Sequence, residues 1–270
     1  MQMHFIYYDP DPKYGRFGNM LFKYFACHII KQVYGHTLTR NVNDIVCRKT
    51  VSDDDWIQWS SSHQKDGYDW GNFDLVLHGA FQQDLILNQH RDFFKSLIHE
   101  GNHDAINDIV SVRDIALPLQ NVASMPQTND LVVHIRLDDF NHNGYNSEIV
   151  HVRHFIELIE SLEFNRLFIV VDQIRNAYEE TYMSHFRKYD PILIQQTVIE
   201  DFKFLIYAQN IICSNSTFAW MAAFLGNASN IWVFNNNFHG RNQVLRTIGL
   251  RSTYVEVTNM DIKTGREYHR

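Results

Sequence analysis

The chain has 270 residues, of which 45% are hydrophobic and 20% are charged, so it can bury a sizeable core and is not a disordered segment. Its 24 Lys and Arg residues against 31 Asp and Glu give a formal net charge of −7, which argues against a basic surface for nucleic acid or anionic membranes. No apolar run approaches the ~18 residues of a membrane span. Any anionic ligand must therefore be held by local donors.

The first half of the chain mixes short strands with longer helical stretches. We predict a strand at residues 4–8, a helix from about 19 to 34, a strand near 75–77 and further helix after Phe81. A glycine-bracketed turn leads into the first helix, Gly15-Arg16-Phe17-Gly18-Asn19. The unpaired amides of such a turn can cradle phosphate or sugar oxygens, and a plain helix-entry loop is the alternative. The aspartates at 53–55 suggest a solvated turn.

Prolines mark a boundary near the middle of the chain. Only five occur, and Pro118 and Pro126 both interrupt the periodic pattern, which places a linker at about 117–130. We therefore expect two halves, residues 1–120 and residues 121–270.

The second half alternates buried strands with helical periods. Short apolar runs lie at 131–135, 167–171, 192–194, 211–213 and 231–234, and an amphipathic helix is expected between the first two. Strands joined by crossover helices predict a parallel, Rossmann-like sheet, and the fold class is α/β with two Rossmann-like halves.

Two polar segments follow strands of this predicted sheet, at the edge where open α/β sheets bind ligands. The first contains His134 and Arg136, whose forked donors suit a diphosphate; a salt bridge to Asp138 or Asp139 is the alternative. The second is Asn215-Ser216-Thr217-Phe218, which precedes an apolar helix. Its hydroxyls are ordinary helix caps and also lie where a helix dipole favours an anion.

Four segments together resemble the fucosyltransferase-type glycosyltransferases, namely the α1,2-, α1,6- and protein O-fucosyltransferases. The turn at 15–19 is similar to G-R-[FL]-G-N-Q, and residues 77–83 are similar to L-x-G-Y-[FW]-Q-S. Residues 134–139 resemble H-x-R-R-G-D, and residues 201–224 resemble the stretch leading into N-S-[ST]-F-S-W-W-x-A-W.

This resemblance implies a GT-B-like pair of Rossmann domains, with the nucleotide sugar bound by the second half and the glycan acceptor by the first. It implies transfer to a glycan hydroxyl with inversion and without a metal. Arg136 then meets the charge of the departing diphosphate, and Phe218 packs near the nucleotide. The expected donor-binding residues are Gly15, Arg16, Phe17, Gly18, Asn19, His134, Arg136, Asn215, Ser216, Thr217 and Phe218.

Departures from the motifs bear on the donor sugar. The second arginine of H-x-R-R-G-D is Leu137, its glycine is Asp138, and the glutamine after Gly-Asn is Met20. At 270 residues the chain is also similar in length to compact glycosyltransferases of large DNA viruses of algae, which include a β-xylosyltransferase. On these grounds UDP-xylose is favoured over GDP-fucose, which is kept as the alternative donor.

Inversion by single displacement needs a base that accepts the proton of the acceptor hydroxyl. We expect Asp74 in this role, because it precedes the strand leading into His78 in the predicted acceptor half. A capping role for Asp74 at the start of that strand is equally consistent with the sequence. Other candidates are His78, Asp84, Asp138 and Asp139.

Two other functions fit parts of the sequence. Asp9 and Asp11 match the D-x-D pattern of metal-dependent transferases, although Pro10 and Pro12 also explain a rigid turn there. Loss of the second arginine fits a glycan-binding or nucleotide-sugar-binding module without activity. Three cysteines without CxxC spacing indicate neither a disulfide framework nor a zinc site, and we expect the cytoplasm, or the host cytoplasm for a viral protein.

Overall fold

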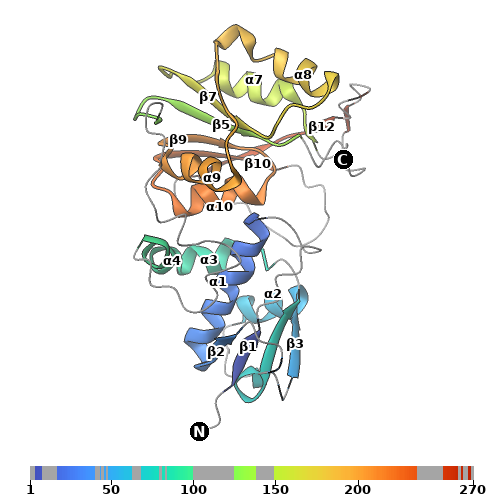
Figure 1. Ribbon diagram of the computed structural model, residues 1–270, viewed down its shortest axis with the longest axis vertical. Helices are drawn as coiled ribbons and strands as arrows, with labels where there is room; N and C mark the ends of the chain where they lie inside the picture. The colour runs from blue at the N-terminus through green and yellow to red at the C-terminus, as the bar shows by residue number, and fades with distance from the viewer. Residues whose placement is uncertain are drawn as a thin grey trace. The chain divides into compact units, whose positions relative to one another are not determined.

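The chain divides into two compact units in the computed structural model. One is formed by Met1–Pro118 with Gln243–Leu245 and the other by Leu119–Asn242 with Arg246–Arg270; we call them the amino-terminal and the carboxyl-terminal unit. The structure describes residues 4–7, 17–39, 43, 46, 48–62, 68–78, 81–82, 84–99, 125–137, 149–235, 252–260, 263 and 267–268. Each unit has a parallel sheet of its own (Figure 1).

A four-stranded parallel sheet with the order β2-β1-β4-β3 forms the centre of the amino-terminal unit. Its strands are β1 (Phe5–Tyr7), β2 (Thr37–Thr39), β3 (Arg48–Ser52) and β4 (Asp74–His78). Its helices are α1 (Phe17–Tyr34), α2 (Asp53–Ser61), the 3-10 helix η4 (Asp69–Asn72), α3 (Asp84–Gln89) and α4 (Arg91–His99). The predicted elements at 4–8, 19–34 and 75–77 correspond to β1, α1 and β4, whereas β2 and β3 carry too little apolar pattern to be recognised.

Tryptophans fill much of the core of this unit. Trp56, Trp59 and Trp70 are buried, and the Trp59 ring stacks on Trp56 at 5.1 Å and on Trp70 at 5.3 Å between centroids. The Trp59 Nε1 group donates a hydrogen bond of 2.8 Å to the Tyr34 hydroxyl. These stacked rings, with the hydrogen bond at the polar tip of Trp59, give helix α2 a fixed position within the unit.

The aspartates at 53–55 form the first turn of α2 and not the solvated turn that we expected. Ser52 is the N-cap residue, its hydroxyl accepts from the Asp55 amide, and the Asp55 carboxylate accepts in return from the Ser52 amide. This reciprocal capping box satisfies amides that a helix start leaves unpaired. Ser52-Asp53-Asp54-Asp55 is therefore a helix start signal that the run of three acids concealed.

A six-stranded parallel sheet with the order β11-β10-β9-β5-β7-β8 forms the centre of the carboxyl-terminal unit. Its strands are β5 (Leu131–Ile135), β7 (Leu167–Val171), β8 (Ile192–Ile194), β9 (Asn210–Cys213), β10 (Asn230–Asn235) and β11 (Ser252–Glu256). The chain adds β7 and β8 on one side of β5, then returns to add β9, β10 and β11 on the other. This is the strand order of the Rossmann fold. The side of the sheet on which the chain adds strands changes between β5 and β9, although all the strands remain parallel.

Helices cover both faces of this sheet (Figure 1). They are α7 (Val152–Glu160), α8 (Ala177–Ser184), the 3-10 helix η7 (Arg187–Tyr189), α9 (Val198–Tyr207) and α10 (Thr217–Leu225). Helices α7 and α8 lie on one face, and α9 and α10 lie on the other. The order of elements confirms the predicted α/β fold class and all five strands expected after residue 130; β11 is an addition.

A small antiparallel sheet with the order β13-β12-β6 completes the described part of this unit. Its strands are β6 (Ile149–Val150), β12 (Asn259–Met260) and β13 (Glu267–Tyr268). Pairing of β12 with β6 brings residue 259 beside Val150, which in turn precedes helix α7. This contact ties the chain beyond residue 251 to the face that carries α7 and α8.

Candidate functional site

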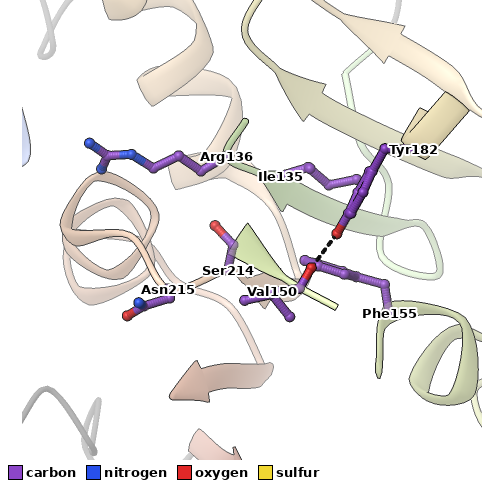
Figure 2. Close-up of a pocket in the computed structure, with 7 residues that line it drawn as sticks. All are labelled: Ile135, Arg136, Val150, Phe155, Tyr182, Ser214 and Asn215. Atoms are coloured by element: carbon purple, nitrogen blue, oxygen red, sulfur yellow. Dashed lines mark hydrogen bonds between the residues drawn. The ribbon is translucent and has the colours of Figure 1, made fainter. Parts of the chain in front are cut away.

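A small, narrow pocket lies at the reversal point between β5 and β9, at the carboxyl edge of the six-stranded sheet. Open α/β sheets bind ligands at such a point, because the connections leaving the two strands diverge there. One side is apolar, and on it the Tyr182 hydroxyl donates a hydrogen bond of 2.7 Å to the Val150 carbonyl. Arg136 and Asn215 lie on the other side (Figure 2). The lining residues are Ile135, Arg136, Val150, Phe155, Tyr182, Ser214 and Asn215.

Strand alternation puts His134 and Arg136 on one face, since successive side chains of a strand point to opposite faces. His134 is buried, and its Nδ1 lies 2.7 Å from the Ser214 hydroxyl at the end of β9. Its ring is 5.7 Å from the ring of Phe218 in helix α10. Two polar segments that are 80 residues apart in the sequence are thus joined by side-chain contacts at one sheet edge.

Arg136 reaches the start of helix α10. Its Nη1 group donates to the Ser216 hydroxyl at 3.4 Å. Ser216 occupies the N-cap position of α10, yet its hydroxyl accepts no hydrogen bond from the helix amides. An N-cap serine normally satisfies one of those amides, whereas the Ser216 hydroxyl accepts from Arg136 instead. A guanidinium and a helix N-terminus at one place favour an anion such as a diphosphate.

Leu137, which occupies the position of the motif's second arginine, is buried in the apolar core of the unit. Strand alternation directs it to the face opposite Arg136, where it is 2% exposed in an apolar cluster with Phe155, Tyr182 and Phe186. An unpaired charge would be costly among these side chains. The anion site therefore depends on one arginine of this segment and on helix α10.

Two carboxylates at the same edge were not among the predicted site residues. Asp172 directly follows β7, whose Val171 pairs with Ile135, so Asp172 and Arg136 leave neighbouring strands. Asp201 lies in the first turn of α9 and accepts a 3.0 Å hydrogen bond from the Gln196 amide. Burial, with smaller contributions from the charges of Asp172 and Glu200, raises the pKa of Asp201 to about 7. The sequence did contain a signal for Asp172, because it directly follows a fully apolar strand and so had to lie at the carboxyl edge of the sheet.

The amino-terminal unit contains the remaining predicted donor-binding residues. Gly15 and Arg16 lie outside the described residues, whereas Phe17, Gly18 and Asn19 form the first turn of α1. The Asn19 side-chain oxygen accepts a hydrogen bond of 2.8 Å from the Gln82 amide. Two of the motif-like segments, 15–19 and 77–83, are thereby joined within this unit.

Asp74 begins β4 and so lies at the amino edge of its sheet, opposite the edge where α1 and α2 begin. It is buried; its Oδ2 accepts from the Val46 amide at 2.8 Å, and its Oδ1 lies 3.5 Å from His4 Nδ1. These contacts are those expected of the capping role that the sequence left open. Of the other base candidates, His78 is exposed at the carboxyl end of β4, and Asp138 and Asp139 lie outside the described residues.

The described residues hold no group of three or more His, Cys, Asp or Glu side chains that could bind a metal ion. Asp9 and Asp11, the alternative metal ligands, are outside that part of the chain. Among the helices described, none is long and apolar enough to span a membrane. Cys27 and Cys213 are buried free thiols.

Comparison with known proteins adds one finding. The sequence model of Glycosyl transferase family 11 matches residues 52–246, which include both β5 and α10 and most of the chain. No curated protein matches the sequence.

Proposed function

The chain belongs to glycosyl transferase family 11 and is therefore a glycosyltransferase with a nucleotide-sugar donor and a glycan acceptor, and we propose that its donor is GDP-fucose. Three of the four segments that resemble fucosyltransferases, at 77–83, 134–139 and 201–224, lie inside the matched region. This family match favours the alternative donor over UDP-xylose, and it gives no support to a viral xylosyltransferase. Leu137, one reason for expecting a different sugar, is accounted for by its buried position.

The contact between Arg136 and Ser216 at the start of α10 carries the proposal. In the proposed reaction the acceptor oxygen attacks the anomeric carbon while the bond from that carbon to the diphosphate breaks. GDP leaves with the bonding electrons, so negative charge grows on the diphosphate. A fixed guanidinium and the amides of α10 stabilise this charge where it develops, which lowers the barrier without requiring a metal ion.

His134 and Phe218 support the same site from the buried side. The hydrogen bond to Ser214 fixes the His134 ring, and the ring of Phe218 lies against it. We assign His134 to orientation of the diphosphate or sugar and Phe218 to packing near the nucleotide. The donor-binding role thus belongs to the carboxyl-terminal unit, and the amino-terminal unit receives the acceptor.

The acceptor proton must pass to a base on the face of the sugar opposite the departing diphosphate. Asp74 is the sequence-based candidate, although its hydrogen bond from Val46 and its contact with His4 at the amino edge favour a capping role. His78 is better placed, because it is exposed at the carboxyl end of β4 and open α/β sheets bind ligands at the carboxyl ends of their strands. The pH profiles of kcat for the Asp74→Asn and His78→Gln variants show which of the two residues is the base.

We also propose that the protein acts in the cytoplasm. The support is the pair of buried free thiols, Cys27 and Cys213, since unpaired cysteines are typical of reducing compartments. Burial raises the pKa of Cys27 to about 12, so this thiol is protonated at neutral pH. Fractionation of cells that express the protein tests the location.

The deciding experiment is calorimetric titration with GDP, UDP, GDP-fucose and UDP-xylose, each with EDTA and with manganese. We expect GDP-selective binding that persists in EDTA, followed by fucose transfer from GDP-fucose to a glycan. Selective binding of UDP would overturn the donor assignment, and a requirement for manganese would overturn metal independence. Binding without turnover of any donor would favour the inactive binding module.

A further inference from the structure

Strand β6 lines the pocket beside Arg136 and pairs with β12 along one of its edges. The pairing is antiparallel, and it continues past β6, where the His151 amide donates to the Thr258 carbonyl at 2.9 Å. In an antiparallel pair, the backbone polar groups of consecutive residues point to alternate sides. The carbonyl of Val150, which directly precedes His151, therefore faces away from β12 and needs a donor from elsewhere.

Tyr182 of helix α8 supplies that donor. Its hydroxyl donates to the Val150 carbonyl at 2.7 Å, and the side chain is buried (Figure 2). The Tyr182 ring lies 6.2 Å from the ring of the fully buried Phe186, which holds it in the core. Burial raises the pKa of the Tyr182 hydroxyl above its ordinary value, so the group is a permanent donor at neutral pH.

Strand β6 and Tyr182 belong to the apolar surface on which the neighbours of Arg136 lie. Ile135 and Leu137 are buried in the same apolar cluster as Val150 and Tyr182. Since successive side chains of an extended segment point to opposite faces, burial of these two neighbours on one face directs Arg136 to the other. Figure 2 shows Ile135 extending toward Tyr182 and Arg136 extending away from it. Packing on the apolar side therefore sets the direction in which the guanidinium points.

We propose that Tyr182 is a positioning residue for the transfer reaction, because its hydroxyl holds β6 in place and thereby fixes the direction of the Arg136 guanidinium. The proposal rests on the proposed function, in which Arg136 meets the charge of the departing diphosphate. Tyr182 acts through Val150 and Ile135, and its own hydroxyl is committed to the Val150 carbonyl. Misplacement of a contact by about 1 Å can cost a factor of up to 100 in rate, so loss of this hydroxyl should be visible in kcat.

A double-mutant cycle between Tyr182 and Arg136 tests this directly. Tyr182→Phe removes the hydroxyl and keeps the ring, and we expect kcat to fall about tenfold. In the Arg136→Ala background, where no guanidinium remains to be positioned, the same substitution should change kcat by less than twofold. Equal losses in both backgrounds would overturn the proposal, as would an unchanged kcat of Tyr182→Phe alone.

Tyr189→Phe is the matched control for the loss of one tyrosine hydrogen bond. Its hydroxyl donates to Glu160 at 2.9 Å in the same unit, and it does not line the pocket. We expect its kcat to stay within about twofold of the parent, because no contact of Arg136 changes. A loss equal to that of Tyr182→Phe would show a general effect of the missing hydrogen bond and would refute a specific role for Tyr182.

Rescue separates the hydrogen bond from the packing of the ring. Replacement of Tyr182 by p-aminophenylalanine keeps an N–H donor at the same place, and it should restore most of the kcat lost in Tyr182→Phe. No recovery would overturn the role of the hydroxyl. If Tyr182→Phe does not fold, Ile135→Val, which removes one methylene group from the same apolar surface, goes through the cycle with Arg136→Ala and must show the same loss of effect in that background.

Failure of this proposal and failure of the proposed function give different results. Full activity of Arg136→Ala would refute the proposed site and this proposal with it. An inactive Arg136→Ala variant beside a fully active Tyr182→Phe variant would refute only the role of Tyr182. The cycle uses whichever sugar the enzyme transfers, and if no donor turns over it is measured on the dissociation constant of GDP or UDP.

Discussion

Polar side chains gather at both edges of the six-stranded sheet, but the two edges use them differently. At the amino edge, Arg166 donates to both carboxylate oxygens of the buried Asp130, with a shortest distance of 2.6 Å. Asn210 donates to two carbonyls and accepts from Asn230 at 2.7 Å. The side chains at this edge satisfy one another.

At the carboxyl edge, charged and hydroxyl groups meet at the start of a helix. Arg136 donates to Ser216 at 3.4 Å, the Ser216 hydroxyl accepts no hydrogen bond from the amides of α10, and the Asp201 carboxyl is partly buried with a raised pKa. The amino-terminal sheet repeats the contrast, with buried Asp74 at one edge and Phe81, strained at a φ of 56°, at the other. We infer that the amino edges supply stability, whereas the carboxyl edges give up stability for ligand binding.

The largest effect should come from Arg136. Arg136→Ala removes the guanidinium that faces the departing diphosphate, and we expect kcat to fall about 1000-fold, as when a donor to a developing charge is lost. The melting temperature should change little, because Arg136 is at a strand end and half-exposed. Steady-state kinetics and thermal denaturation measure both. Arg187→Ala, at an exposed position of η7, is the control, and full activity of Arg136→Ala would remove the proposed site.

Arg166 tests the opposite edge. Arg166→Ala leaves the buried Asp130 carboxylate without its cation, and we expect a lower free energy of unfolding, with activity of the folded enzyme unchanged. Burial by itself raises the pKa of Asp130, but hydrogen bonds from Arg166 and Gln127 hold it below its usual value. The stability this carboxylate contributes is therefore present above its unfolded pKa and is lost as the pH falls through the folded one. In urea titrations, the free energies of unfolding of the parent protein and of Arg166→Ala should become equal below about pH 4.

Asp201 should show that the carboxyl edge costs stability. The pKa of Asp201 in the folded protein, about 7, is above the ordinary 3.8. Asp201 therefore lowers the free energy of unfolding by an amount that is absent below the unfolded-state pKa and grows as the pH rises to 7. Asp201→Asn should therefore stabilise the protein at pH 8, on the order of 2 kcal/mol after allowance for partial exposure, with no gain near pH 3. Denaturant titration across this range measures the difference. A stability difference independent of pH would contradict the assignment.

The smallest effect is expected for Asp74. Asp74→Asn weakens the hydrogen bond from the Val46 amide and the contact with His4, and we expect a loss of about 1 kcal/mol in unfolding free energy. If Asp74 only caps the strand start, kcat of the folded variant stays within about twofold of the parent. A fall of 100-fold or more would instead make Asp74 the catalytic base. Circular dichroism melts and initial rates separate the two outcomes.

The sequence predicted the carboxyl-terminal unit better than the amino-terminal one, for physical reasons. Strands buried on both faces read as continuous apolar runs, so β5, β7 and β9 were visible, and polar residues at the ends of such runs identified His134 inside β5 and Arg136 and Ser216 after β5 and β9. The short strand β2 and the polar strand β3 (Arg48–Ser52) have no such pattern.

Other features depend on tertiary structure. Sequence patterns do not indicate on which side of β5 the strand β9 is added. Only the observed arrangement brings Ser214 to His134. Asp172 and Asp201 resemble ordinary loop and helix-start acids. Their proximity becomes visible only when the strands that precede them, β7 and β8, are placed side by side. The strain at Phe81 follows from packing against Trp56 and has no local signature at all.

The position of β5 in the centre of its sheet has a consequence for how the chain folds. Strand β5 can pair with β7 as soon as residue 171 has been synthesised, but its other edge is covered only by β9, which ends at Cys213. Until then a row of backbone donors and acceptors flanked by apolar side chains is open to other chains. Nascent or partly unfolded molecules should therefore aggregate through this edge, and chaperone demand should be greatest for chains that end between β8 and β9.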